Sequence, residues 1–224
     1  MVETGPLHRL DGRRLYLCTA DRPDLAEFVA ACILGGVDVV QLREKHLDAR
    51  PLIKRAELVG EVCRNERVPF ILNDRPDLAL AAGADGVHVG QDDIPPAVAR
   101  SILGPGAIVG LSTHAPAEWS GASAEPVDYL SAGPVNPTPT KPGRAGTGLE
   151  YLSQVAATPA GGPEGIPWFV TGGVTPDSIP DMVRAGARRF VVVRYLTESA
   201  DPEKAAARLC VAIDEATGRA WSGS

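Results

Sequence analysis

Short apolar runs rich in β-branched residues alternate with longer segments of mixed polarity along the whole chain. In the longer segments, apolar residues recur at the spacing of an amphipathic helix, as do Leu25, Phe28, Val29, Cys32 and Ile33. The short runs are almost continuously apolar, which predicts buried strands. Eight such runs occur, at residues 14–20, 37–44, 69–74, 86–90, 107–112, 128–134, 167–173 and 189–196.

This alternation predicts an α/β fold in which helices cover a parallel sheet. Eight strand–helix units in 224 residues match a single (β/α)8 TIM barrel. A doubly wound open sheet is the alternative, but its first turn normally carries a glycine-rich fingerprint, which residues 18–23 lack. We therefore expect one domain over residues 1–224, with its core at about 14–216 and flexible ends at 1–12 and 218–224.

The composition of the chain limits the kinds of molecule that it is expected to bind. The net charge of −6 argues against a broad surface for nucleic acid or anionic membrane, so any affinity for phosphate has to be local. The four cysteines are far apart in apolar runs, which is typical of buried, reduced thiols and not of a zinc site or a disulfide framework. No signal peptide and no apolar run of membrane-spanning length is present, so we expect a cytoplasmic protein.

Polar side chains gather where the predicted strands end, which in a TIM barrel is the catalytic face. In the second strand Gln41, Arg43 and Lys45 follow a period of two and share one face. Two cations in a barrel mouth require an anion to neutralise them. The alternative is a solvated cluster of charges at the end of a strand.

Acidic residues close the third and fourth strands, with Asn73-Asp74 after one and Asp93 after the other. Carboxylates on neighbouring strands suit Mg²⁺, which takes a few carboxylate oxygens together with water and substrate phosphate. Each aspartate taken alone is also a common turn or helix-capping residue. Their position beside a cationic strand favours the metal site.

Further candidates follow the remaining strands. Ser112 ends the fifth strand and either donates into the barrel mouth or caps the next helix. The loop at 133–141 combines three prolines with Thr138, Thr140 and Lys141, and either binds a phosphate ester or is a plain surface loop. Paired glycines at 172–173 and the step Val193-Arg194 occupy the usual phosphate corner of a barrel. Two anion sites, one cationic and one mainly of backbone, predict a diphosphate and a monophosphate ligand.

The motifs together resemble the thiamine-phosphate synthase family over roughly residues 14–215. They are Gln41-Leu42-Arg43-Glu44-Lys45, Asn73-Asp74, the run 86–93, the run 110–114, the loop 133–141 and Gly172-Gly173-Val174. The resemblance implies a transferase of thiamine biosynthesis that joins 4-amino-2-methyl-5-hydroxymethylpyrimidine diphosphate to 4-methyl-5-(2-phosphoethyl)thiazole, releasing pyrophosphate.

The resemblance also implies a role for each matched position. Asp74 and Asp93 are expected to bind Mg²⁺, and the pyrimidine diphosphate is expected to contact Gln41, Arg43, Lys45, Asn73, Ser112 and Lys141. The thiazole phosphate is expected to contact Thr138, Thr140, Gly173, Val193 and Arg194. The catalytic set would be Arg43, Lys45, Ser112 and Lys141, which stabilise the departing diphosphate in a dissociative reaction. The ligands are small molecules, and a homo-oligomer is left open.

Two positions depart from the family pattern. Arg194 stands where many relatives have a small serine, and Asn136 replaces a more usual aromatic residue. A thiazole tautomerase of the same fold is the nearest alternative, but it has no diphosphate substrate and no need for Arg43, Lys45 and the two aspartates. A sugar-phosphate isomerase or a non-catalytic binding protein is more distant, because the former needs an acid–base pair and the latter needs no metal site.

Overall fold

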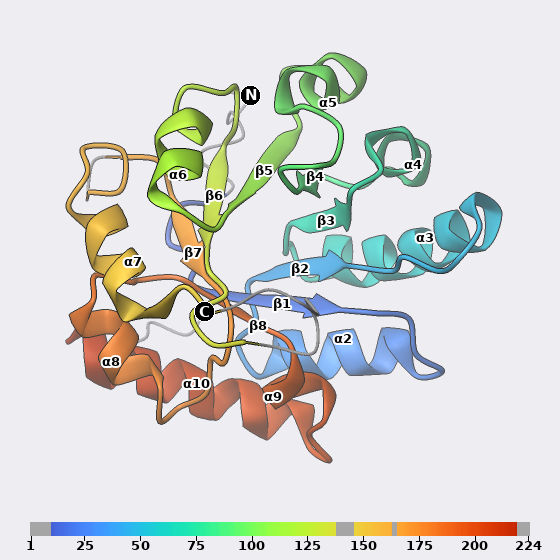
Figure 1. Cartoon of the computed structure of the whole chain (residues 1–224). Coiled ribbons are helices and arrows are strands. Elements are labelled where there is room, and N and C mark those ends of the chain that lie inside the picture. The colour runs from blue at the N-terminus through green and yellow to red at the C-terminus, as the bar shows by residue number, and fades with distance from the viewer. Residues whose placement is uncertain (1–9, 138–145, 163–164, 219–224) are drawn as a thin grey trace, which may run out of the picture.

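The computed structural model describes residues 10–137, 146–162 and 165–218. Eight parallel strands pair in chain order, and β8 returns to pair with β1, which closes the barrel (Figure 1). The predicted α/β TIM-barrel fold is confirmed. The strands are β1 (Leu15–Thr19), β2 (Val39–Leu42), β3 (Phe70–Asn73), β4 (Gly86–Val89), β5 (Ile108–Thr113), β6 (Tyr129–Ala132), β7 (Trp168–Val170) and β8 (Phe190–Val192).

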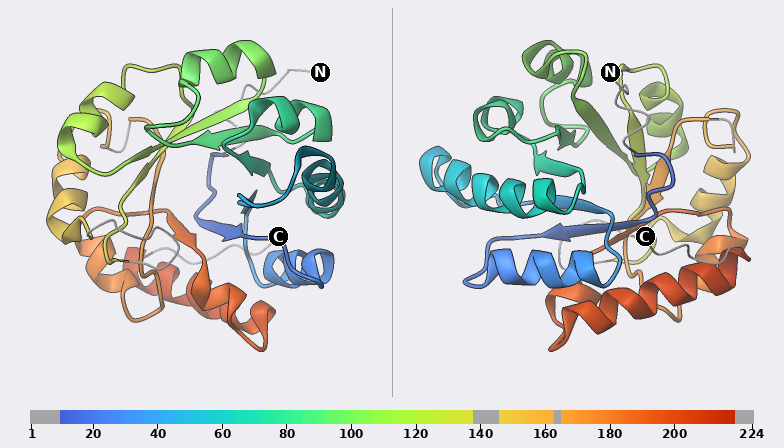
Figure 2. Two further views of the ribbon diagram at one scale, coloured as in Figure 1. Left: turned by 45° about the vertical axis from the view of Figure 1, so that its right-hand side comes forward. Right: turned by 180° about the vertical axis from the view of Figure 1, so that it is seen from behind.

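The helices form an outer ring around these strands (Figure 2). Pro76, Pro96, Pro116 and Pro202 each occupy the first position of a helix, where a missing N–H costs nothing and the fixed φ is already helical. The helices in the described ranges are α2 (Leu25–Leu34), α3 (Ala49–Asn65), α4 (Pro76–Ala82), α5 (Pro96–Leu103), α6 (Pro116–Ala122), α7 (Gly148–Ala156), α8 (Ile179–Arg184), α9 (Arg194–Thr197) and α10 (Pro202–Thr217).

The predicted eighth strand is wrong at its end. It was expected to continue to residue 196, but β8 stops at Val192, and Arg194–Thr197 forms the short helix α9. The run is apolar for a different reason, since Leu196 is fully buried as a helical residue. At the other end of the chain, Leu10 falls in the segment expected to be flexible, yet it is fully buried against the barrel interior.

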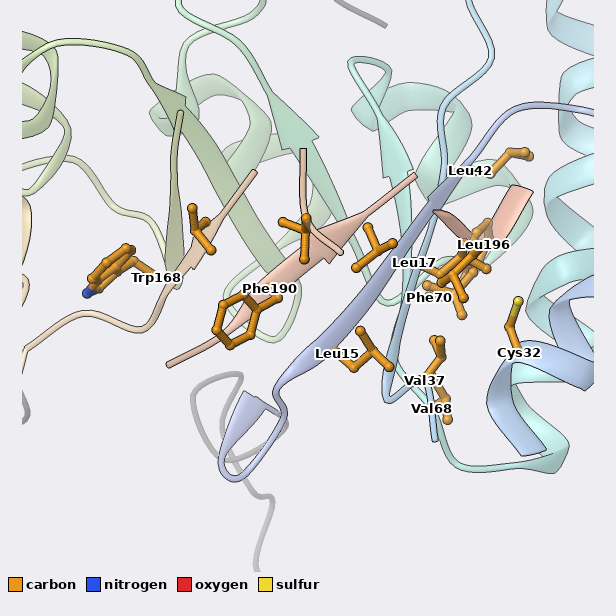
Figure 3. Close-up of a cluster of buried hydrophobic side chains, with 14 of the residues drawn as sticks. Leu15, Leu17, Cys32, Val37, Leu42, Val68, Phe70, Trp168, Phe190 and Leu196 are labelled. Atoms are coloured by element: carbon orange, nitrogen blue, oxygen red, sulfur yellow. The ribbon is translucent and has the colours of Figure 1, made fainter. Parts of the chain in front are cut away.

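Two apolar layers follow from the period of two along each strand. Residues of one parity, such as Leu15, Leu17 and Leu42, point outward and pack beneath the helices, as Figure 3 shows. Residues of the other parity fill the barrel interior, where the cluster consists of Leu10, Tyr16, Val39, Ile71, Ile108, Tyr129 and Phe169. Further along the same inward positions the residues become polar, as in Gln41 after Val39, so the interior ends in a polar floor beneath the barrel mouth.

Aspartates stabilise the opposite, amino-terminal face of the barrel. Asp38, just before β2, accepts hydrogen bonds from the backbone N–H groups of Arg14 (2.7 Å) and Leu15 (2.9 Å). Asp85, before β4, accepts one from Phe70 N–H (2.9 Å). Asp128, before β6, accepts one from Val109 N–H (2.7 Å). Each carboxylate satisfies a backbone donor at the start of the neighbouring strand, which is a structural role.

Asp38 gives a prediction for stability. Burial raises the pKa of Asp38 from its ordinary value of 3.8 to about 6, against the backbone N–H groups that lower it. Between these two values the folded protein holds a proton that the unfolded chain has released, so the contribution of Asp38 to stability falls as the pH rises through 6. Relative to the wild type, Asp38→Asn should therefore gain unfolding free energy between pH 4 and pH 7, by up to about 3 kcal/mol. Urea denaturation at a series of pH values measures this, and parallel pH curves for the two proteins would contradict it.

Candidate active site

A cavity of about 390 Å³ opens at the carboxyl ends of the strands. All eight strands, or the segments that follow them, contribute to its wall. The structure brings together in this cavity every predicted site residue that it describes, namely Gln41, Arg43, Lys45, Asn73, Asp74, Asp93, Ser112, Gly173, Val193 and Arg194. Thr138, Thr140 and Lys141 lie outside the described residues.

The cationic side of the cavity comes from β2 and the residues after it. Gln41 is buried, Arg43 is half-buried and Lys45 is exposed, so these three residues extend from the floor to the rim. Lys45 Nζ lies 2.8 Å from Asp74 Oδ2. Within the ranges described, no ion pair involves the guanidinium of Arg43. Arg43 therefore presents a half-buried positive charge to the cavity, and an anionic ligand would neutralise it.

The carboxylates of Asp74 and Asp93 meet beside this cationic strip. Asp74 has a positive φ of 62°, which places it at a sharp turn out of β3, a conformation that aspartate tolerates better than most residues. Burial raises the pKa of Asp74, the Lys45 ammonium opposes that rise, and a hydrogen bond with Asp93 adds to it. Asp93 is held in turn by Gly90 N–H, which donates to its Oδ2 at 2.8 Å.

The chemistry of this pair fits a hard divalent cation. Two adjacent carboxylates supply oxygen ligands, and a cation between them would offset the burial and the carboxylate repulsion that together raise the pKa of Asp74. Across the described ranges, no group of three or more His, Cys, Asp or Glu residues is arranged to hold a metal. A metal at Asp74 and Asp93 would consequently complete its coordination with water and substrate oxygens, which is the usual situation of Mg²⁺.

The opposite side of the cavity has little charge. Gly172 (φ 96°) and Gly173 (φ 77°) follow β7 in a conformation that favours glycine. A Cβ on Gly172 would lie 2.5 Å from Pro134 Cβ, so the glycine lets the segment after β6 lie against this turn. Val193 and Arg194 line the same cavity as the glycines, and Arg194 adds a cationic side chain to its wall. Backbone N–H groups in a turn of this kind are suited to binding an anion.

Sequence reasoning missed several residues of the cavity wall. Tyr16, Tyr129, Ser131 and Thr171 all line it, and so does His88, which stands between two valines in the fourth strand. Tyr16 and Tyr129 lie in apolar runs and look like core residues. Their inward parity could have identified them, because Tyr16 pairs in register with Val39 and Tyr129 with Gly110, which both occupy inward positions.

Comparison with known proteins gives a consistent result. The family model described as thiamine monophosphate synthase matches residues 15–196. The thiamine-phosphate synthase of Thermobifida fusca is 50% identical over 206 residues, covering 90% of this chain and 92% of that protein. The one from Mycolicibacterium smegmatis is 46% identical and covers 94% and 96%. The solved thiamine phosphate pyrophosphorylase from Pyrococcus furiosus superposes with a TM-score of 0.80 at 30% identity, covering 91% of this chain and 96% of its own.

Proposed function

Because the chain belongs to the thiamine monophosphate synthase family, we propose that its cavity holds a pyrimidine diphosphate and a thiazole phosphate together and joins them. The activity is that of a thiamine-phosphate synthase, a transferase of thiamine biosynthesis. The observation that carries the assignment of the site is the asymmetry of one cavity. Arg43, Lys45 and a carboxylate pair form one side, and a glycine turn with little charge forms the other.

The diphosphate belongs on the charged side. Arg43 and Lys45 supply positive charge, and Asn73 adds an amide at the end of β3. Mg²⁺ bound by Asp74 and Asp93 would neutralise diphosphate oxygens and so stabilise the leaving group. Lys45 Nζ, which contacts Asp74 at 2.8 Å, lies close enough to the proposed metal site to contact the same diphosphate. Lys141 belongs to this set by family resemblance.

The thiazole phosphate belongs at the glycine turn. Gly173 leaves its backbone accessible, and a Cβ there would lie 2.5 Å from Asn136 Nδ2, so a larger residue would crowd this corner. Val193 and Arg194 complete the corner, and family resemblance adds Thr138 and Thr140. Arg194 would make a charge-assisted contact with the phosphate where many relatives use a serine.

The family resemblance implies a dissociative reaction, and the residues of the cavity fit it. The bond between the pyrimidine methylene carbon and the diphosphate breaks first, and the thiazole nitrogen then attacks the resulting cation. This nitrogen carries no proton, so the reaction needs no general base. Arg43, Lys45 and Ser112 stabilise the negative charge that grows on the departing diphosphate, and the two halves of the cavity hold the reactants in line.

The proposal is tested by incubating the protein with both phosphorylated substrates and Mg²⁺. Pyrophosphate and thiamine phosphate should appear in equal amounts, and both should vanish when either substrate is left out. Chelation of the metal should abolish product formation. Interconversion of thiazole phosphate isomers without Mg²⁺ and without pyrophosphate would instead identify a tautomerase and overturn the proposal.

The cellular location is also part of the proposal. All four cysteines are buried and free, which fits the reducing cytoplasm that the sequence predicts. In the described ranges, none of the helices has the length and apolar character needed to traverse a bilayer.

A further inference from the structure

A chain of hydrogen bonds crosses the buried floor of the cavity. Gln41 Nε2 donates to Tyr16 Oη at 2.9 Å, and the hydroxyls of Tyr16 and Tyr129 lie 2.9 Å apart. Tyr129 Oη is 2.9 Å from His88 Nδ1, and His88 Nε2 is 2.9 Å from Ser112 Oγ. All five side chains are at most 9% exposed. The chain therefore joins Gln41 to Ser112, two residues assigned above to the pyrimidine diphosphate.

Counting donors fixes the direction of this chain. Tyr16 accepts from Gln41, so its single proton goes to Tyr129. Tyr129 then accepts from Tyr16 and gives its own proton to His88 Nδ1. Burial raises the pKa of both tyrosines well above the usual value, so both phenols keep their protons. A histidine that accepts at Nδ1 has its proton on Nε2 and donates it to Ser112 Oγ.

The reverse direction conflicts with the surroundings of Gln41. It would have Tyr129 donate to Tyr16, and among the described residues that contact Tyr16 Oη its proton would then have no acceptor unless the Gln41 amide turned over. Turning the amide would bring its nitrogen to Cys18 Sγ, which now donates to Gln41 Oε1 at 3.1 Å. That exchange would replace the S–H bond to the amide carbonyl by an N–H contact with the sulfur, which is only a weak acceptor. Cys18 thus favours the present orientation of the Gln41 amide, and this orientation determines the direction of the hydrogen-bond chain.

We propose that this directed chain holds His88 neutral with its proton on Nε2, and thereby keeps Ser112 a hydrogen-bond donor toward the bound substrate. Ser112 Oγ accepts from His88 and also from Ser131 Oγ at 3.3 Å, so neither of these two contacts uses the proton of Ser112. Tyr16 and Tyr129 are positioning residues, because they act on Ser112 only through His88.

The direction matters for the reaction proposed above, on which its kinetic consequence rests. A diphosphate oxygen is an acceptor and gains negative charge as it departs, so a donating Ser112 stabilises it and an accepting Ser112 would repel it. A neutral His88 also keeps positive charge off the floor of a cavity in which a cation forms on the substrate. The floor of the cavity therefore supplies hydrogen-bond donors that carry no positive charge.

The tautomer can be observed without substrate. In ¹⁵N-labelled protein, two-bond ¹H–¹⁵N correlation spectra distinguish the protonated from the bare ring nitrogen, and His88→Asn identifies the His88 signals among those of the four histidines. We expect a bare Nδ1 and a protonated Nε2 in the wild type. A proton on Nδ1 would overturn the proposal, whatever the enzyme's activity.

Tyr16→Phe tests whether the direction of the hydrogen bond at Tyr16 determines the tautomer of His88. Tyr16 has no recorded hydrogen bond to His88 in the described structure, yet its loss frees Tyr129 to donate or accept, so His88 should become a mixture of tautomers. Tyr129→Phe should do the same. Tyr151→Phe is the matched control, because Tyr151 is a buried tyrosine that donates to Thr113 Oγ1 at 2.8 Å and is absent from the chain. If the tautomer of His88 were unchanged in Tyr16→Phe, the hydrogen bond of Tyr16 would not determine the protonation of His88, and this part of the proposal would be wrong.

Kinetics test the role of the chain in the reaction. The loss of one directed hydrogen bond to the leaving group should lower kcat about tenfold in Tyr16→Phe and Tyr129→Phe relative to Tyr151→Phe. A mixed tautomer with an unchanged kcat would overturn the catalytic role of the chain. An inactive wild type with the expected tautomer would instead overturn the proposed function and leave the assignment of His88 standing.

Discussion

Replacing Asp93 with asparagine is expected to lower the turnover number by about a hundredfold or more, since one charge is lost from the carboxylate pair that we propose binds the metal beside the leaving group. Asparagine has the same shape and keeps an oxygen for Gly90 N–H, which donates to Asp93 Oδ2 at 2.8 Å. The fold should therefore remain intact. Steady-state release of pyrophosphate over a range of Mg²⁺ concentrations measures the effect, and higher Mg²⁺ should restore part of the turnover.

The matched control is Asp77→Asn. Asp77 is an exposed aspartate that pairs with Arg75 at 2.6 Å and does not line the cavity. Its replacement should leave turnover and the Mg²⁺ requirement within about twofold of the wild type, as expected for a surface pair. If Asp93→Asn behaved like Asp77→Asn, Asp93 would be only a turn residue that binds Gly90, and the two-carboxylate metal site would be wrong.

Most of the fold was predictable because two regular patterns in the sequence specify the barrel: the alternation of strands with helices, and the alternation of inward and outward residues within each strand. Alternation of strand and helix gave the topology, and the parity of residues within each strand placed Gln41, Arg43 and Lys45 on one face. The end of the eighth strand was not predictable in this way. A run of apolar residues satisfies a strand and a short buried helix equally well, and tertiary contacts decide that Leu196 is packed as part of α9.

The candidate site was predictable at its rim and less so at its floor. Charged residues at strand ends, such as Asp74 and Arg43, stand out because burial of a charge requires a partner. Tyr16 and Tyr129 did not stand out, because a tyrosine ring in an apolar run is compatible with any core position. Only the register across the closed barrel brings their hydroxyls together, and that information is not local in the sequence.

The space required by this floor also explains a residue that carries no chemistry. Gly110 lies at an inward position of β5, and a Cβ there would be 2.1 Å from the ring of Tyr129. The Tyr129 ring occupies that space, stacks on His88 with centroids 5.4 Å apart and meets Phe169 edge-on at 5.6 Å. The hydroxyl of Tyr129 is consequently held in place by packing of its ring as well as by its hydrogen bonds, which suits a residue that orients others.

Replacing Lys45 with alanine is expected to lower the turnover number by about 10²- to 10³-fold, because it removes a cation that we propose stabilises the departing diphosphate. Lys45→Arg should retain part of the activity, since it keeps the charge but not the compact ammonium geometry. Steady-state kinetics with a saturating pyrimidine diphosphate measure both variants, and circular dichroism confirms the fold. Lys45 is exposed on 45% of its side chain, so its loss should cost little stability.

The Mg²⁺ dependence of Lys45→Ala separates two roles for the same ammonium. In the structure Lys45 Nζ contacts Asp74 Oδ2 at 2.8 Å, where it competes with a metal for that oxygen. If Lys45 acts on the leaving group, its removal frees Asp74, so the half-saturating Mg²⁺ concentration should stay the same or fall while turnover collapses. If Lys45 served only to hold Asp74 in place for the metal, the Mg²⁺ requirement would rise and excess Mg²⁺ would restore turnover. Restoration by Mg²⁺ would thus remove Lys45 from the catalytic set and leave Arg43, just after β2, as the cation proposed to face the diphosphate.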